Sequence, residues 1–237
     1  MKIMILTAAL QEAASFIEYL SNTKPLSIAK RNYLYGTAHG HELYLANTGV
    51  GAIAAANTTT ALCESLQPEL IFICGAAGGL VARQCIGDFL IGETIFDLDH
   101  YDLPEIFSDT PFADWLIDPH SQQSVEYAFT APEEFLARCL QTGMARVRKG
   151  IIASSSIFPT PKNKLAQLKA LHCDVIEMES AAVYHAAAHY AIPVIAIRAI
   201  SNHLDAAGND LGTSSDAITI CANRIAALLN DCLINIA

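Results

Sequence analysis

The chain has 237 residues, of which 52% are hydrophobic and only 16% charged, and its formal net charge at pH 7 is −10. This composition excludes a disordered chain and a coiled coil, and the length allows one large α/β domain or two small ones with a substantial core. The acidic balance argues against a nucleic-acid groove, because a protein that binds a phosphate backbone needs a basic stripe.

The first 75 residues predict strands and helices in alternation. In chain order we expect a strand over 2–7, a helix over 11–20, a strand over 41–49, a helix over 52–66 and a strand over 70–75. Gly49 and Gly51 separate the second strand from the second helix, and Pro68 lies just beyond the end of that helix. The run 70–75 is continuously apolar and bounded by glycine, which is typical of a strand buried on both faces.

The rest of the chain continues the alternation after a long interruption. We expect strands over 87–99, 149–156 and 194–202, and helices over 163–171, 177–190 and 213–234. The segment 97–125 is rich in Asp, Pro and aromatic residues and has no helical period, so we expect a long loop excursion, and such excursions often carry function. The sequence contains no linker, repeat or low-complexity tract, and we expect residues 1–237 to form a single domain.

This order of elements, with strands dense in Ile, Val and Leu, predicts an α/β fold with three α/β/α layers and a mixed, mostly parallel central sheet. Ligands of such sheets bind beyond the carboxyl ends of the strands. The stretches that follow the apolar runs should therefore converge on one cleft, together with the segment 177–179. These stretches are 8–12, 49–51, 75–79, 154–159 and 201–205.

The cysteines and the N-terminus indicate the compartment. Seven cysteines, an odd number without any C-x-x-C pair, favour a reducing environment over a disulfide framework, and eight histidines without H-E-x-x-H spacing predict no metal site. Gln11 and Glu12 interrupt the apolar N-terminus where a signal peptide needs its cleavage region. No stretch reaches the roughly 18 uninterrupted apolar residues of a membrane helix. We expect a soluble cytoplasmic protein that binds neither metal nor membrane.

Five segments, taken together and in order, resemble one family. They are T-G-V-G-A-I-A-A-A (48–56), C-G-A-A-G-G-L (74–80), I-G-D (86–88), V-I-E-M-E-S-A-A-V-Y-H-A-A (175–187) and I-R-A-I-S-N-H-L-D (197–205). They are similar to the nucleoside phosphorylase/nucleosidase superfamily, and within it to the methylthioadenosine/S-adenosylhomocysteine nucleosidases and the futalosine hydrolases. The resemblance covers nearly the whole chain except 97–145. It implies a nucleoside phosphorylase-like fold, a purine nucleoside as ligand, no cofactor and a homodimer.

The resemblance implies that the E-M-E triplet binds the sugar. Glu179 would accept hydrogen bonds from both ribose hydroxyls, which a carboxylate can do through strong charge-assisted bonds, and Met178 would pack against the sugar. For Glu177, which faces another direction, a substrate contact and a structural role are equally open. The alternative for either glutamate is a favourable position at the start of a helix. Val50 and Ala76 are further expected contacts of the substrate.

The resemblance also implies two catalytic residues. Glu12 stands where the hydrolases keep a carboxylate that orients and deprotonates water and stabilises an oxocarbenium-like sugar; its alternative is an ordinary Glu in the first turn of a solvated helix. Asn202 stands where many relatives have an aspartic acid that protonates N7 of adenine. Asn cannot donate a proton outright, but it can donate a hydrogen bond to O6 of a 6-oxopurine and accept one from its protonated N7. Arg198 and Ser201 are expected to brace this strand end.

Two loop residues point to the same base. Phe158 matches the aromatic residue that stacks on the base, and Pro159 lies where relatives offer a backbone N–H to N1 of adenine, a donor that proline lacks. Hypoxanthine carries its own hydrogen on N1 and loses nothing there. Phosphate capture has less support, because Ala76 replaces a hydroxyl in the glycine-rich turn and Arg83 follows this turn rather than lining it.

The sequence therefore predicts a purine nucleosidase that hydrolyses the N-glycosidic bond of a 5′-modified purine nucleoside. The leading substrate is futalosine, hydrolysed to hypoxanthine and dehypoxanthine futalosine in menaquinone biosynthesis. The alternatives are a methylthioadenosine/S-adenosylhomocysteine nucleosidase, a purine nucleoside phosphorylase and a nucleoside-binding protein without catalysis. His100, Tyr101 and Phe107 are candidate contacts of the 5′ substituent across a dimer.

Overall fold

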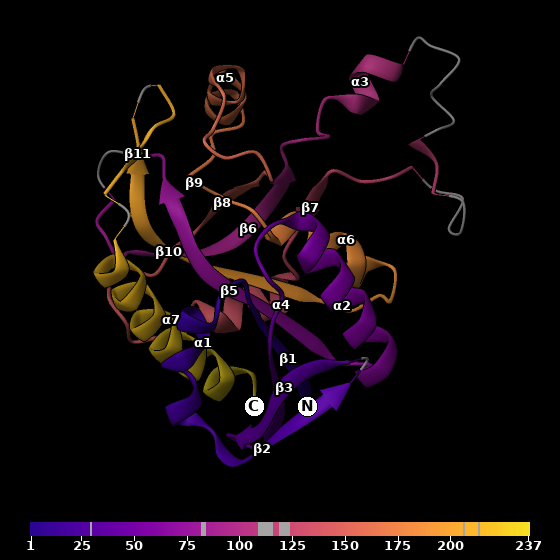
Figure 1. Ribbon diagram of the computed structural model, residues 1–237, viewed down its shortest axis with the longest axis vertical. Coiled ribbons are helices and arrows are strands. Elements are labelled where there is room, and N and C mark those ends of the chain that lie inside the picture. The colour runs from indigo at the N-terminus through magenta and orange to yellow at the C-terminus, as the bar shows by residue number, and fades with distance from the viewer. Residues whose placement is uncertain (29, 82–83, 109–115, 119–123, 206, 213) are drawn as a thin grey trace.

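A single mixed sheet lies between two layers of helices in the computed structural model (Figure 1), which describes residues 1–28, 30–81, 84–108, 116–118, 124–205, 207–212 and 214–237. The strands are β1 (Lys2–Thr7), β2 (Ser21–Ile28), β3 (Arg31–Ala38), β4 (His41–Asn47), β5 (Leu70–Gly79), β6 (Phe89–Asp97), β7 (Ala128–Thr130), β8 (Lys149–Ser154), β9 (Val175–Glu177), β10 (Val194–Leu204) and β11 (Asp210–Leu211). The helices are α1 (Leu10–Ala14), the short 3-10 helix η1 (Ile17–Tyr19), α2 (Ala52–Leu66), α3 (Leu103–Phe107), α4 (Glu133–Cys139), α5 (Lys162–Ala170), α6 (Ser180–Ala188) and α7 (Ser215–Ile236). The predicted three-layer α/β fold is confirmed.

The centre of the sheet is parallel. Strands β4, β1, β5 and β10 lie side by side in this order with parallel pairing, so their carboxyl ends meet at one edge. Antiparallel pairs add β3 and β2 beyond β4, and β6 beside β10. Strands β5, β10, β6, β8 and β9 pair in a closed ring, because β9 joins β8 back to β5. This ring brings the end of β9 next to the ends of β5 and β10.

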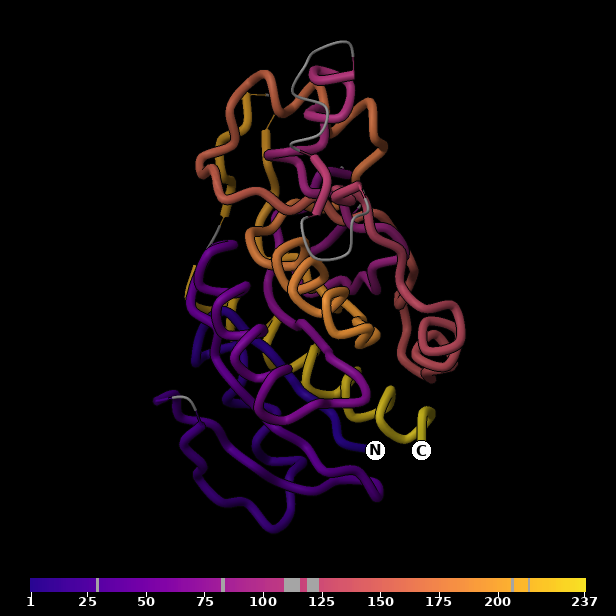
Figure 2. Tube along the Cα trace, turned by 90° about the vertical axis from the view of Figure 1, so that its right-hand side faces the viewer, coloured from indigo at the N-terminus to yellow at the C-terminus, as the bar shows by residue number. Residues whose placement is uncertain are grey.

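Alternate side chains of the central strands fill two cores. In β1, Ile3 and Ile5 lie in the core that includes the buried face of α7, whereas Met4 and Leu6 lie in the core that includes α2 and α6. Figure 1 shows α1 and α7 together on one side of the sheet and α2 and α6 on the other. In Figure 2 the two termini lie side by side, and the hairpin of β2 and β3 forms the end of the molecule opposite α3 and α5.

The hairpin of β2 and β3 was not predicted from the sequence. Strand β2 is mostly exposed and contains Pro25, so it has no apolar alternation, as is common for an edge strand. The predicted helix over 11–20 is shorter in the structure and ends as η1, and the helix predicted over 177–190 begins only at Ser180. The predicted excursion contains the short helix α3, while its parts 109–115 and 119–123 lie outside the described residues.

Helix α7 is long and apolar enough to cross a membrane by length and composition alone. It is the only such helix in the part of the chain that the structure describes. One of its faces is buried in the core beside β5 and β10, the arrangement of a core helix. Ser214 caps its N-terminus by accepting a hydrogen bond from the backbone N–H of Ala217 at 3.1 Å.

Candidate active site

The carboxyl ends of the parallel strands surround a cavity of about 430 Å³. The structure thus brings together the five stretches that the sequence predicted to converge. Pro159 is exposed and is not among the residues that line the cavity, so its contact with a substrate stays a prediction. The other predicted site residues all line the cavity: Glu12, Val50, Ala76, Phe158, Glu177, Met178, Glu179 and Asn202.

Glu12 is held in a fixed position by backbone donors. Its Oε2 accepts hydrogen bonds from the backbone N–H groups of Ala8 and Ala9, both at 3.0 Å, and its Oε1 accepts one from Ala76 at 2.8 Å. The side chain is buried, so it is not the solvated first-turn glutamate of the alternative interpretation. A carboxylate has about four lone-pair positions, and three donors leave one position on Oε1 for a further partner.

Glu179 lies at the N-cap position of α6 and is only 4% exposed. Its Oε1 accepts a hydrogen bond from the backbone N–H of Gly51 at 2.8 Å. Gly51 has φ of 90°, a conformation that favours glycine and turns this N–H toward the carboxylate. Burial first, and then the neighbouring charge of Glu177, raise the pKa of Glu179 to about 7, although Arg198 acts in the opposite direction.

Glu177 uses both of its oxygens within the protein. They accept hydrogen bonds from the backbone N–H groups of Glu179 and Ser180, and Oε2 also forms an ion pair with Nη2 of Arg198. Glu177 therefore caps the start of α6 and neutralises a buried cation. Of the two glutamates in the triplet, Glu179 is the one with capacity left for a sugar.

Arg198 is completely buried and joins its strand β10 to Glu177 and Ser180 at the start of α6, consistent with the prediction that it braces this strand end. Burial opposes its charge, but the neighbouring carboxylates, Glu177 first, raise the pKa of Arg198 above its ordinary value. Its Nη2 also donates to Ser180 Oγ at 2.9 Å, whereas Nε and Nη1 have no partner among the described residues. A Cβ on Gly75 would lie 2.5 Å from Arg198 Nη1 and 2.8 Å from Glu12 Oε1, so only glycine permits this packing.

Asn202 lines the same cavity and offers a hydrogen-bond donor. Its Oδ1 accepts a hydrogen bond from the hydroxyl of Ser201 at 2.8 Å, and Nδ2 has no partner among the described residues. Ser201 thereby orients the amide, which agrees with the bracing role expected for it. Phe158, 62% exposed, contributes an aromatic face to the wall of the same cavity.

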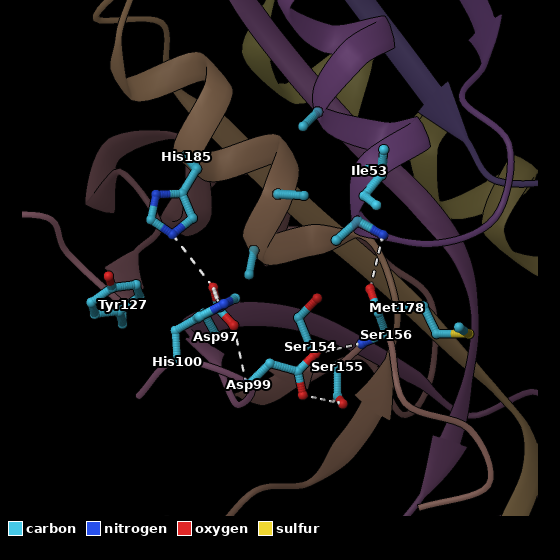
Figure 3. Close-up of a pocket in the computed structure, with 14 residues that line it drawn as sticks. Ile53, Asp97, Asp99, His100, Tyr127, Ser154, Ser155, Ser156, Met178 and His185 are labelled. Atoms are coloured by element: carbon cyan, nitrogen blue, oxygen red, sulfur yellow. Dashed lines mark hydrogen bonds and ion pairs between the residues drawn. The ribbon is translucent and has the colours of Figure 1, made fainter. Parts of the chain in front are cut away.

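A second cavity of about 530 Å³ lies next to the first and shares Ser155 and Met178 with it. Figure 3 shows this second cavity, where Ile53 of α2 and His185 of α6 face the ends of β6 and β8. Its apolar wall comes from the small side chains of α2 and α6, and its polar wall comes from the segments that follow β6 and β8. The two cavities adjoin at Ser155 and Met178, which line both.

Two histidines converge on one aspartate in the second cavity. Asp97 Oδ2 lies 3.0 Å from His100 Nδ1 and 3.6 Å from His185 Nε2 (Figure 3). Burial would raise the pKa of Asp97, but these histidines outweigh it and lower the pKa below its ordinary value. Asp99 accepts hydrogen bonds from the Ser155 hydroxyl at 2.6 Å and from the Ser156 N–H at 2.8 Å, which holds the loop between the cavities.

His100 was predicted from the sequence as a candidate contact of the substrate, whereas Asp97 and His185 were not predicted. No spacing in the sequence relates these two residues, because they come from β6 and α6 and meet only in the fold. Among the described residues, no group of three or more His, Cys, Asp or Glu side chains could hold a metal ion. None of the described residues lining the first cavity is an arginine, and Arg83 lies outside the described residues.

Comparisons with known proteins identify the family of the chain. A family model described as the phosphorylase superfamily matches residues 2–234. A curated 5′-methylthioadenosine/S-adenosylhomocysteine nucleosidase from Shewanella oneidensis is 28% identical over 233 residues, which cover 97% of this chain and 94% of the relative. A nucleosidase of the same name from Bacillus cereus is 28% identical over 222 residues, covering 91% of this chain and 90% of the relative.

Solved structures share the whole fold. The 5′-methylthioadenosine/S-adenosylhomocysteine nucleosidase of Campylobacter jejuni superposes with a TM-score of 0.81 at 23% identity, covering 99% of each chain. A futalosine hydrolase mutant of Helicobacter pylori superposes with a TM-score of 0.78 at 22% identity, covering 98% of this chain and 97% of the other.

Proposed function

This chain belongs to the phosphorylase superfamily, and from that premise we propose that it is a nucleosidase that hydrolyses the N-glycosidic bond of a 5′-modified purine nucleoside. The observation that carries the proposal is the arrangement of Glu12, Glu179 and Asn202 around one cavity. Each of the three side chains faces a different part of a nucleoside. In this proposal Glu12 acts on the water, Glu179 binds the sugar and Asn202 contacts the base.

Glu179 binds the ribose in this proposal. Its Oε1 takes one donor from Gly51, which leaves three lone-pair positions of the carboxylate for the two vicinal hydroxyls. Charge-assisted hydrogen bonds of this kind are worth roughly 1.5–3 kcal/mol each. Met178, which lines both cavities, packs against the sugar and marks the position of its 5′ carbon.

Glu12 acts on the water. One lone-pair position of its Oε1 orients a water molecule toward C1′, and the carboxylate takes a proton from that water as the oxygen bonds to carbon. The electron pair of the broken C1′–N9 bond leaves with the base. The ionised carboxylate also stabilises the positive charge that develops on the sugar ring before water adds.

Water is favoured over phosphate as the nucleophile. Phosphorolysis requires cationic side chains that hold a dianion, most effectively arginine. The described residues that line the cavity include no arginine, and the buried Arg198 is engaged by Glu177.

Likeness to known proteins supports methylthioadenosine and S-adenosylhomocysteine as the first candidate substrates. The two curated relatives described above are both methylthioadenosine/S-adenosylhomocysteine nucleosidases. This weakens the expectation that futalosine is the leading substrate. A 5′-modified inosine such as futalosine is the second candidate. The observation that favours it is Asn202, whose amide nitrogen donates to an acceptor such as O6, whereas the amino group of adenine would oppose it with another donor.

The second cavity accommodates the 5′ substituent. It continues from Met178 and combines an apolar wall with the polar group of Asp97, His100 and His185. A long substituent with a polar end fits this cavity better than a methylthio group alone.

We also propose a homodimer, supported by the large apolar side chains of Val50 and Ile53, which are 65% and 87% exposed at the cavities. Light scattering that finds only monomer would contradict the dimer.

The test is release of free base from four nucleosides in phosphate-free buffer. Methylthioadenosine, S-adenosylhomocysteine, futalosine and inosine are each incubated with the protein, and adenine and hypoxanthine are resolved by chromatography. We expect rapid release from at least one 5′-modified nucleoside and slow release from inosine. No base from any of the four would contradict the proposed function.

A further inference from the structure

Asp99 joins the segment after β6 to the loop after β8. It lies shortly beyond the end of β6, lines the second cavity, and its side chain is only 18% exposed. Its Oδ1 accepts a hydrogen bond from the hydroxyl of Ser155 at 2.6 Å, and its Oδ2 accepts one from the backbone N–H of Ser156 at 2.8 Å (Figure 3). Both donors belong to the loop that begins directly after β8.

The donors around Asp99 require a carboxylate. Ser155 and Ser156 donate to different oxygens, and Nζ of Lys164 lies 4.0 Å from Oδ1 and balances the charge. Asparagine has a single acceptor oxygen and would turn its amide hydrogens toward one of the two serine donors. Lys164 also donates to the carbonyl oxygen of Leu98, which holds the cation beside Asp99. Both carboxylate oxygens are thus occupied within the protein, which suits a residue that fixes a loop.

The loop that Asp99 fixes carries the aromatic wall of the first cavity. While the hydroxyl of Ser155 donates to Asp99, its oxygen accepts a hydrogen bond from the backbone N–H of Ile157 at 3.2 Å. Phe158 follows directly, and both Ile157 and Phe158 line the first cavity. Their side chains are 48% and 62% exposed, so packing alone does little to fix them. The direction of the Phe158 ring therefore depends on the backbone turn that Asp99 holds.

The same loop also contacts the segment that holds Glu179. The hydroxyl of Ser156 accepts a hydrogen bond from the backbone N–H of Ala52, the first residue of α2, at 3.2 Å. Ala52 follows Gly51, whose N–H donates to the carboxylate of Glu179. Asp99 is therefore linked through one loop to the aromatic wall and to the start of α2.

We infer that Asp99 is a positioning residue for the nucleosidase reaction, which holds Phe158 against the purine base and, through Ser156, keeps Gly51 in place beside Glu179. This role rests on the proposed function, since it assumes that the first cavity binds a purine nucleoside. Asp99 itself contacts neither the base nor the sugar. Its removal should therefore weaken base binding only while Phe158 is present to be misplaced.

A double-mutant cycle tests this role, with binding of the free bases adenine and hypoxanthine measured by calorimetry, which needs no turnover. Stacking on an aromatic side chain accounts for about 10- to 100-fold in affinity, and we expect Phe158→Ala to weaken the better-bound base by this factor. Asp99→Ala should weaken it by about 5- to 10-fold, and Asp99→Asn, which keeps one acceptor, by less. In the Phe158→Ala background, either Asp99 substitution should change the affinity by less than about twofold.

The matched control is Asp102→Asn, which removes the same charge from an exposed aspartate of the same segment and should leave base affinity unchanged. General damage to the cavity would make the Asp99 substitutions equally costly with and without Phe158, and that result would overturn the inference. Unchanged affinity in both Asp99 variants would overturn it as well, and so would a wild type that binds neither base. If Asp99→Ala does not fold, the cycle with Asp99→Asn decides. Failure of the proposed function would be seen separately, as base binding that follows the expected cycle without turnover of any nucleoside.

Discussion

Replacing Glu179 with glutamine should stabilise the free protein at neutral and alkaline pH while it destroys activity. The carboxyl group is 4% exposed and lies close to Glu177, and together burial and this second charge raise the pKa of Glu179 from 4.5 to about 7. In the folded protein the group therefore keeps its proton at pH values where the unfolded chain has already lost it. As pH rises from 4.5 to about 7, unfolding becomes progressively more favourable because of this group.

The size of the effect follows from the two pKa values. About 1.4 kcal/mol for each pKa unit gives a loss of about 3 kcal/mol of folding free energy between pH 4.5 and pH 8. Glu179→Gln cannot ionise, so it escapes this loss and keeps an oxygen that accepts from Gly51. The same substitution removes one ribose acceptor and weakens the other, and we expect kcat/KM to fall by about two to three powers of ten.

Urea unfolding at several pH values measures the first effect. The difference in free energy of unfolding between Glu179→Gln and wild type should grow by about 3 kcal/mol in favour of the variant between pH 4.5 and pH 8. Glu18→Gln, which changes an exposed glutamate, should run parallel to wild type over the whole range. If the Glu179→Gln curve also runs parallel to wild type, the carboxyl group is not strained by its surroundings and the reasoning is wrong.

The other side chains of the site give three further predictions. Glu12→Gln should lower kcat by about two or more powers of ten with KM near that of wild type, measured by steady-state kinetics; an equal loss in KM would show that Glu12 binds substrate rather than preparing water. Asn202→Asp should shift the ratio of adenine to hypoxanthine release toward adenine and introduce an acid-side dependence, and an unchanged ratio would show that Asn202 does not contact the base. Arg198→Met should reduce the free energy of unfolding by about 3–5 kcal/mol in urea titrations, because it leaves Glu177 buried without its cation; a loss below about 1 kcal/mol would contradict the buried ion pair.

Much of the site could be predicted because it depends on where apolar runs end. The run 70–75 ends at a glycine, and the strand over 2–7 ends at Thr7. The rule that ligands bind beyond parallel strand ends then places Glu12 and Ala76 in one cleft. The E-M-E triplet was predicted to reach the same cleft, and it does so at the junction of β9 and α6.

The roles within the triplet could not be separated from the sequence. Glu177 and Glu179 have the same side chain, and what distinguishes them is Arg198, which lies on another strand and pairs with Glu177. The helix also begins later than predicted, because Glu177 accepts the N–H groups of Glu179 and Ser180 and thereby caps it. Long-range contacts of this kind leave no periodic signal in the chain.

Asp210, which also lines the first cavity, illustrates a second limit. It lies in a strand of two residues after a turn, and only its antiparallel pairing with Leu204 brings it into the cavity. A strand this short has no alternation that a sequence pattern could detect. The same limit applies to β2, whose polar edge residues resemble a loop in the sequence.

The most direct test of the central claim is whether base release requires phosphate. The protein is incubated with its best 5′-modified purine nucleoside in phosphate-free buffer and again with added phosphate, while base release is followed by chromatography and the sugar product by phosphorus NMR. Hydrolysis predicts equal rates in both buffers, and no sugar 1-phosphate at any time. Base release that appears only with phosphate, accompanied by a sugar 1-phosphate signal, would contradict the assignment of water as the nucleophile and of Glu12 as the residue that prepares it.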